Sequence, residues 1–187
     1  MRNHISSFGG DPSRVTLWGE SAGAVAVHLL TMSPSRHKLP ARSAIVSSGV
    51  ALAGWALERE PRRRAAALAA ALGWHTAPEA DVKSCGQDRP ESTEDEALLQ
   101  FLLRQPAHQL VRHMKDVVAD DLTGAEHLAW VPCIEPPLLP DHSGEDTRIL
   151  TADPARLLES GAVAKIPIMM GVDSHEGMVT RNCTGLC

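Results

Sequence analysis

The sequence predicts an α/β fold with parallel strands, and three short segments near the N-terminus carry that prediction. Residues 15–18 form an apolar, β-rich run typical of a buried strand, and residues 44–47 form a second one. Residues 22–30 are mostly Ala, Val and Leu, which predicts a helix buried on most sides, and Pro34 ends it. A buried helix between two strands makes a βαβ unit, in which the strands run parallel.

Later segments alternate between predicted helices and irregular stretches. Pro61 and Gly73 predict a helix over 61–72, because proline favours the first turn and glycine the position past the end. Acidic residues predict a helix start near residue 93, and a further helix opens at Pro106 and runs through about Val118. A short helix over 155–160 and a buried strand over 166–171 follow, while 75–92 and 136–147 are interpreted as loops.

Composition narrows the class of protein. The chain has 187 residues, enough for one domain with a core, and its net charge of −5 comes from interspersed charges, so we expect no nucleic-acid partner. The first residues are not followed by the apolar stretch of a signal peptide, and no apolar run in the chain is long enough for a membrane span. The four cysteines do not have the spacing of metal ligands, so we expect no metal site, and they neither prove nor exclude disulfides. We also expect no cofactor. Asn182 begins a glycosylation sequon, which matters only in a secreted protein.

The chemistry of the chain is concentrated where the first strand meets the first helix. The segment 19–23 reads Gly-Glu-Ser-Ala-Gly. A Gly-x-Ser-x-Gly sequence between a strand and a helix predicts a sharp, strained turn that exposes the Ser21 hydroxyl at the carboxyl edge of the sheet. Ser21 then precedes the helix, and the N–H of Ala22 points at a developing oxyanion. We expect a side chain at Gly19 or Gly23 to clash with the neighbouring strand or helix. The alternative is a structural serine, because short motifs also occur by chance.

Several motifs together resemble the type-B carboxylesterase and cholinesterase family of α/β-hydrolases. The blocks follow the order of that family and cover nearly the whole chain; they are 8–12, 15–24, 44–49, 95–99 and 167–177. The resemblance implies a partial α/β-hydrolase fold that lacks the N-terminal and C-terminal parts of the family. Residues 1–187 would then be the central fragment of a single domain.

The resemblance also implies roles for individual residues. Ser21 would attack the ester carbonyl, Ala22 would supply one oxyanion-hole N–H, and Glu176 would be the acid of the triad. Glu20 would add negative charge beside the nucleophile, and Ser48 would support the triad acid. Each has a simpler alternative: Glu176 as a loop carboxylate, Ser48 as turn chemistry and Glu20 as an exposed carboxylate.

Departures from the family pattern shape the expected function. No histidine of the chain has the His-Gly context of the catalytic base; His28 is interpreted as a core residue, and His175 as wrongly directed for Glu176. Trp74 and Phe101 stand where the family has a disulfide, so we expect an apolar contact there.

We therefore expect a fragment of a serine esterase that acts on small carboxylic esters and is inactive alone. One alternative is a fragment of a non-catalytic, esterase-like adhesion or receptor protein, and another is a truncated product without function. The family is typically secreted, lumenal in the endoplasmic reticulum or membrane-anchored, but the sequence leaves localisation, substrate and oligomeric state open.

Overall fold

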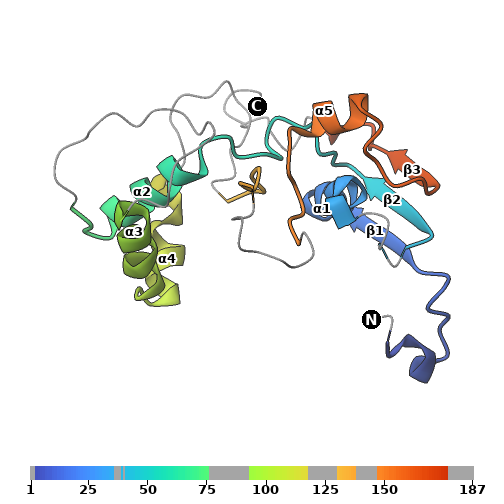
Figure 1. Ribbon diagram of the computed structural model, residues 1–187, viewed down its shortest axis with the longest axis horizontal. Coiled ribbons are helices and arrows are strands. Elements are labelled where there is room, and N and C mark those ends of the chain that lie inside the picture. The colour runs from blue at the N-terminus through green and yellow to red at the C-terminus, as the bar shows by residue number, and fades with distance from the viewer. Residues whose placement is uncertain are drawn as a thin grey trace, which may run out of the picture. The chain divides into compact units, whose positions relative to one another are not determined.

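A computed structural model describes residues 3–35, 39, 41–75, 93–117, 130–137 and 147–176 (Figure 1). The chain forms two compact units, one made of Met1–Leu57 with Pro132–Cys187 and the other of Glu58–Val131. The expected single domain over 1–187 stays a prediction. The Asn182 sequon, most of the predicted loop over 75–92 and three cysteines, at 85, 183 and 187, lie outside the described residues.

The first unit contains a parallel three-stranded sheet in the order β1-β2-β3. A short 3-10 helix, η1 (Ile5–Phe8), precedes β1 (Thr16–Glu20), α1 (Ala22–Met32) and β2 (Ser43–Ser47). After the second unit, α5 (Pro154–Glu159) leads to β3 (Ile168–Gly171). The predicted βαβ unit is confirmed, because β1 and β2 pair in parallel on either side of α1 in the chain.

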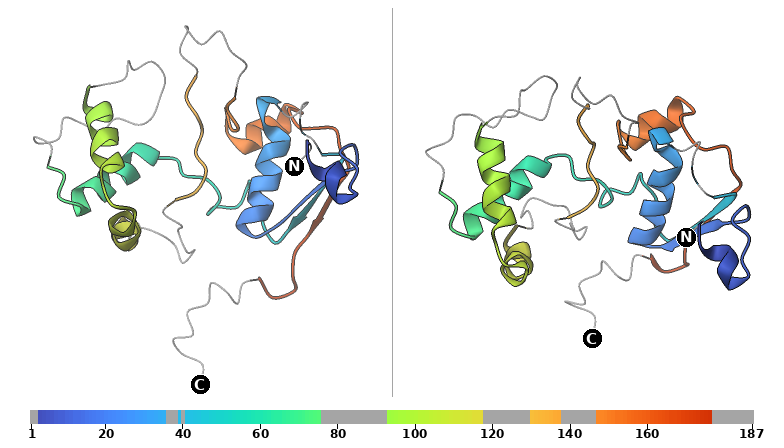
Figure 2. Two further views of the ribbon diagram at one scale, coloured as in Figure 1. Left: turned by 90° about the horizontal axis from the view of Figure 1, so that it is seen from below. Right: turned by 60° about the horizontal axis from the view of Figure 1, so that its bottom comes forward.

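The core of this unit lies between α1 and one face of the sheet (Figures 1 and 2). Ala24 and Val27 of α1 pack against Ala44 and Val46 of β2, and all four are buried. The opposite side of α1 packs into a second cluster that includes Leu150, next to α5. The helix therefore anchors the sheet on one side and α5 on the other, and this fixes the turn at its N-terminus.

The prediction that 15–18 and 166–171 form buried strands is wrong in its burial. Trp18 of β1 is 73% exposed and Met169 of β3 is 68% exposed. Both lie in register with Ile45 on the face away from α1, because side chains alternate between the two faces of a strand. Apolar runs predict burial on both faces of a parallel sheet, but among the described residues α1 covers only one of them.

The second unit is helical. It contains α2 (Pro61–Ala71), α3 (Thr93–Leu103), α4 (Ala107–His113) and a 3-10 turn, η3 (Met114–Val117). The helix predicted from Pro106 to about Val118 is α-helical only to His113 and tightens into η3 at its end, as helix C-termini often do. Trp74 and Phe101 are in contact, with ring centroids 4.8 Å apart, which confirms the expected apolar contact between these two residues.

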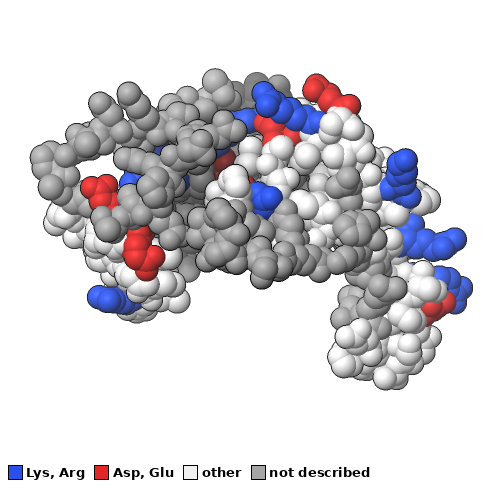
Figure 3. All heavy atoms as spheres, in the orientation of Figure 1, with Lys and Arg blue, Asp and Glu red and all other residues white. Residues whose placement is uncertain are grey.

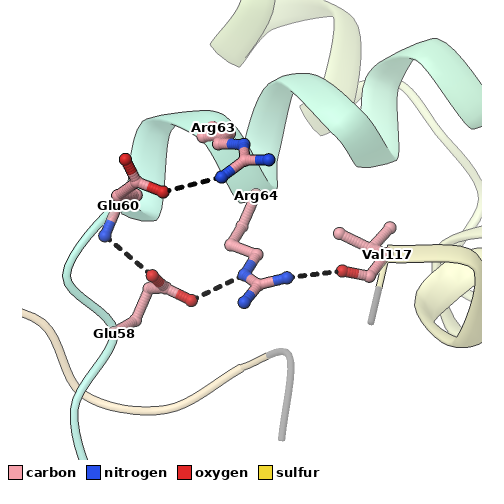
Figure 4. Close-up of polar contacts among 5 residues, drawn as sticks. All are labelled: Glu58, Glu60, Arg63, Arg64 and Val117. Carbon is pink, nitrogen blue, oxygen red and sulfur yellow. Dashed lines mark hydrogen bonds and ion pairs between the residues drawn. The ribbon is translucent and has the colours of Figure 1, made fainter. Parts of the chain in front are cut away.

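A polar network stabilises the start of α2 (Figure 4). The Arg64 guanidinium donates to Glu58 at 2.7 Å and to the Val117 carbonyl at 2.8 Å, so it joins α2 to η3. The other oxygen of Glu58 accepts the N–H of Glu60 at 2.7 Å. Burial acts to raise the pKa of Glu58. The N–H groups of Glu60 and Arg59 and the charge of Arg64 outweigh burial and hold this pKa below its usual value. The Arg63–Glu60 pair beside it is exposed.

Candidate active site

The turn between β1 and α1 holds Ser21 in an unusual backbone conformation. Its φ is 54° and its ψ is −120°, outside the regions that residues other than glycine normally occupy. The Ser21 N–H donates to Ser47 at 2.9 Å, and its carbonyl accepts from Ala24 and Val25 at 3.0 and 3.1 Å. Ser21 thus continues the sheet ladder with its N–H and starts the helix with its carbonyl, which keeps the strained turn in place.

Two glycines let the backbone fold this tightly. A Cβ at Gly19 would overlap the carbonyl of Gly23, and a Cβ at Gly49 would overlap the carbonyl of Ser21. The expected clash at Gly23 itself is wrong, because a Cβ there meets no described atom within 4 Å. Gly49 was not identified as part of this turn from the sequence, where Ser48-Gly49 indicates only the end of a strand. The only sequence signal for Gly49 is its position just after the strand predicted over 44–47.

The acidic candidate, Glu176, lies in the turn after β3 and is exposed. A hydrogen bond from the Ser48 hydroxyl and another from the Asp173 N–H hold the pKa of Glu176 below its ordinary value. The bond from Asp173 measures 2.9 Å. Ser48 follows β2, has a φ of 56°, and donates its N–H to Gly171 of β3 at 2.8 Å. Ser48 therefore favours the ionised form of Glu176.

Ser21, Ser48 and Glu176 follow three neighbouring parallel strands and so share one edge of the sheet. Ligands of open α/β sheets bind at this carboxyl edge. Glu20, the last residue of β1, is exposed beside the turn. The N–H of Ala22 is the first of α1, and an N–H at that position has no partner within the helix.

The histidines that the structure describes are not joined to these groups by any recorded hydrogen bond. His28 is buried in α1, and its Nδ1 accepts the N–H of Ala51 at 3.2 Å, which fits the expected core role. Burial lowers its pKa, so the ring favours the neutral form. His175 contacts the Ser174 hydroxyl through Nδ1 at 2.7 Å. The described partners of Glu176 are Ser48 and Asp173 and include no histidine.

The ranges that the structure describes contain neither a metal cluster nor a membrane-spanning helix. No group of three or more His, Cys, Asp or Glu side chains there is placed to hold a metal ion. No helix in the same ranges has the length and apolar character needed to cross a membrane.

The parallel sheet, the helix packed on it and the strained serine turn define a partial α/β-hydrolase fold. The sequence matches the Carboxylesterase family over residues 1–184, and the chain belongs to that family.

Characterised relatives cover this chain almost fully. It is 36% identical over 180 residues to Cholinesterase 1 of Branchiostoma lanceolatum, which covers 95% of this chain and 43% of that protein. It is 32% identical to mouse Neuroligin-3 over 95% of this chain and 18% of that protein. It is 29% identical to rat Bile salt-activated lipase over 95% of this chain and 24% of that protein. The chain thus spans less than half the length of these relatives.

Proposed function

We propose that this chain carries the nucleophile and the acid of a serine esterase that hydrolyses small carboxylic esters. The observation that carries the proposal is the conformation of Ser21. A serine held at a φ of 54° costs about 1–3 kcal/mol, and such strain gathers at functional sites. Its position between β1 and α1, at the same edge as Glu176, fits the order serine then acid along an α/β-hydrolase chain.

In this mechanism the Ser21 oxygen attacks the ester carbonyl, and the negative charge collects on the carbonyl oxygen. The N–H of Ala22 and the partial positive charge at the start of α1 stabilise that oxygen. A base takes the Ser21 proton and returns it to the departing alcohol while the acyl group stays on Ser21. Water then attacks the acyl group, releases the carboxylic acid and restores the Ser21 hydroxyl. Glu176 stays ionised because Ser48 and the Asp173 N–H favour its charged form, and an ionised acid can orient an imidazolium.

The described residues supply no base for Ser21. No described histidine is bonded to Ser21 or Glu176, and a serine hydroxyl without a base is un-ionised at neutral pH. We therefore expect the 187-residue chain alone to have at most a small residual rate, as enzymes that lose one triad member do. Added imidazole should replace the absent side chain in part.

The test is labelling of the 187-residue chain with a fluorophosphonate probe, with and without added imidazole. In this reaction the Ser21 oxygen bonds to phosphorus, fluoride leaves and imidazole takes the proton. We expect no labelling without imidazole and labelling that rises with imidazole concentration. The adduct should map to Ser21, be absent in Ser21→Ala and fall at least tenfold in Glu176→Gln.

Two results would contradict the proposal. Robust labelling without imidazole would show that the chain holds its own base. A folded chain that imidazole never activates would remove the case for Ser21 as a nucleophile. The second result would favour the alternative, a non-catalytic adhesion or receptor protein, which the match to Neuroligin-3 supports. Retention of both Ser21 and Glu176 supports the enzyme instead.

A further inference from the structure

A hollow of about 500 Å³ lies in the first unit, at the edge of the sheet where the strands begin. Its lining comes from the segments that precede all three strands: Pro12 before β1, Arg42 before β2 and Pro167 before β3. Ser21 lies at the opposite edge. The five residues of β1 place roughly 16 Å between the two edges, so the hollow is separate from the proposed active site. Its volume is in the range of small-molecule sites.

Two positive side chains, Arg42 and Lys165, line this hollow. Neither makes a side-chain hydrogen bond or ion pair with another described residue, although the chain as a whole carries a net charge of −5. The nearby acid, Asp11, is already engaged, because it pairs with Arg14 at 2.7 Å and accepts from Ser13. Figure 3 shows basic side chains gathered at the right-hand end of the view, where the strands of Figure 1 begin. Within the part of the chain that the structure describes, the positive charge of this hollow is thus uncompensated.

The remaining walls are mostly apolar, and they come from Pro12, Leu39, Ile166 and Pro167. An inorganic anion would meet the two cations but would leave these walls against water. A neutral apolar molecule would meet the walls but would leave the cations unused. Only a ligand with a charged end and a short hydrocarbon part uses both features, since the burial of hydrocarbon surface is favourable.

We propose that this hollow binds the carboxylate of a short aliphatic acid between Arg42 and Lys165, with its chain against the apolar walls. The guanidinium of Arg42 presents parallel N–H donors that match the two oxygens of a carboxylate. The ammonium of Lys165 adds a second charge. The site is independent of the proposed esterase chemistry, because it shares no residue with the edge that holds Ser21.

The test is isothermal titration of the 187-residue chain with octanoate, octanol and inorganic phosphate at one ionic strength. We expect octanoate to bind, and to bind at least tenfold more tightly than either octanol or phosphate. The double variant Arg42→Gln/Lys165→Gln should weaken octanoate binding at least tenfold. The matched control is Arg156→Gln, which removes an exposed cation of α5 outside the hollow and leaves Asp11 paired with Arg14; it should change the affinity less than twofold.

Every other outcome overturns the proposal. Absence of octanoate binding to the folded chain removes the site. Equal affinity for octanol identifies an apolar surface, such as the exposed sheet face around Trp18. Equal affinity for phosphate identifies a simple anion site. An equal loss in Arg156→Gln identifies a general charge effect. Far-UV circular dichroism of each variant shows that it is folded, and unchanged octanoate binding in Ser21→Ala separates this site from the esterase edge.

Discussion

Substitution of the two glycines of the serine turn by alanine should have opposite effects on stability. A Cβ at Gly19 would overlap the Gly23 carbonyl and lie 2.7 Å from the Ala24 nitrogen. Both neighbours are backbone atoms, so no side-chain rotation can relieve the contact. A Cβ at Gly23 meets nothing within 4 Å and lies in the first turn of α1.

The magnitude follows from these contacts. Overpacking of a core usually costs about 1–3 kcal/mol, and we expect Gly19→Ala to lie at the upper end, near 3 kcal/mol, because backbone must move. Gly23→Ala should be neutral or stabilise the protein by up to about 1 kcal/mol, since alanine favours a helix more than glycine does. The two variants should therefore differ by at least about 3 kcal/mol in the free energy of unfolding.

The assay is urea unfolding of both variants and the parent chain, followed by far-UV circular dichroism, with thermal unfolding beside it. A difference of about 3 kcal/mol corresponds to roughly 6–12 °C in Tm for a chain of this size. An insoluble Gly19→Ala beside a soluble Gly23→Ala agrees with the prediction. The reasoning would be refuted if the free energy of unfolding of Gly19→Ala lay within about 0.5 kcal/mol of the parent value. It would also be refuted if Gly23→Ala lost as much stability as Gly19→Ala.

Three further outcomes are expected. Arg64→Ala should lower the free energy of unfolding of the helical unit by about 1–3 kcal/mol, because it leaves half-buried partners unpaired; Arg63→Ala, an exposed control, should cost under about 0.5 kcal/mol in the same denaturation. Ser48→Ala should raise the pKa of Glu176 toward its usual value, measured by NMR titration of the side-chain carboxyl carbon; an unchanged pKa would exclude the hydroxyl as the cause. Burial lowers the pKa of His28, so as the pH falls the unfolded chain binds a proton at this residue before the folded chain does. The free energy of unfolding should therefore be highest above the unfolded pKa, about 6.5, and fall as the pH drops below it. His28→Asn, which keeps an acceptor, should flatten that part of the stability curve, as shown by denaturation between pH 7.5 and 5.5.

The sequence was most informative where local pattern and tertiary context agree. The strand at 15–18, the helix after Ser21 and the strand at 44–47 were predictable because apolar runs bounded by breakers depend mostly on neighbours in the chain. The position of Ser21 on a sharp turn was predictable for the same reason, since the surrounding glycines stand within a few residues of it.

Features that depend on distant segments were not predictable. The exposure of Trp18 follows from which face of the sheet α1 covers, and an apolar run does not encode that choice. The need for glycine at position 49 arises from the carbonyl of Ser21, far away in the chain. The Ser48 contact with Glu176 likewise joins two strand ends that only the sheet brings together.

The ring contact between Trp74 and Phe101 has a consequence for how the second unit matures. Its geometry, with centroids 4.8 Å apart and planes inclined at 52°, relies on the packing of two apolar faces and includes no sulfur. A cystine at such a place would form only where the thiol–disulfide balance of the compartment allows it. The aromatic pair forms as soon as the chain folds, so this link between the segment after α2 and α3 needs neither an oxidase nor an isomerase, and it survives in a reducing compartment.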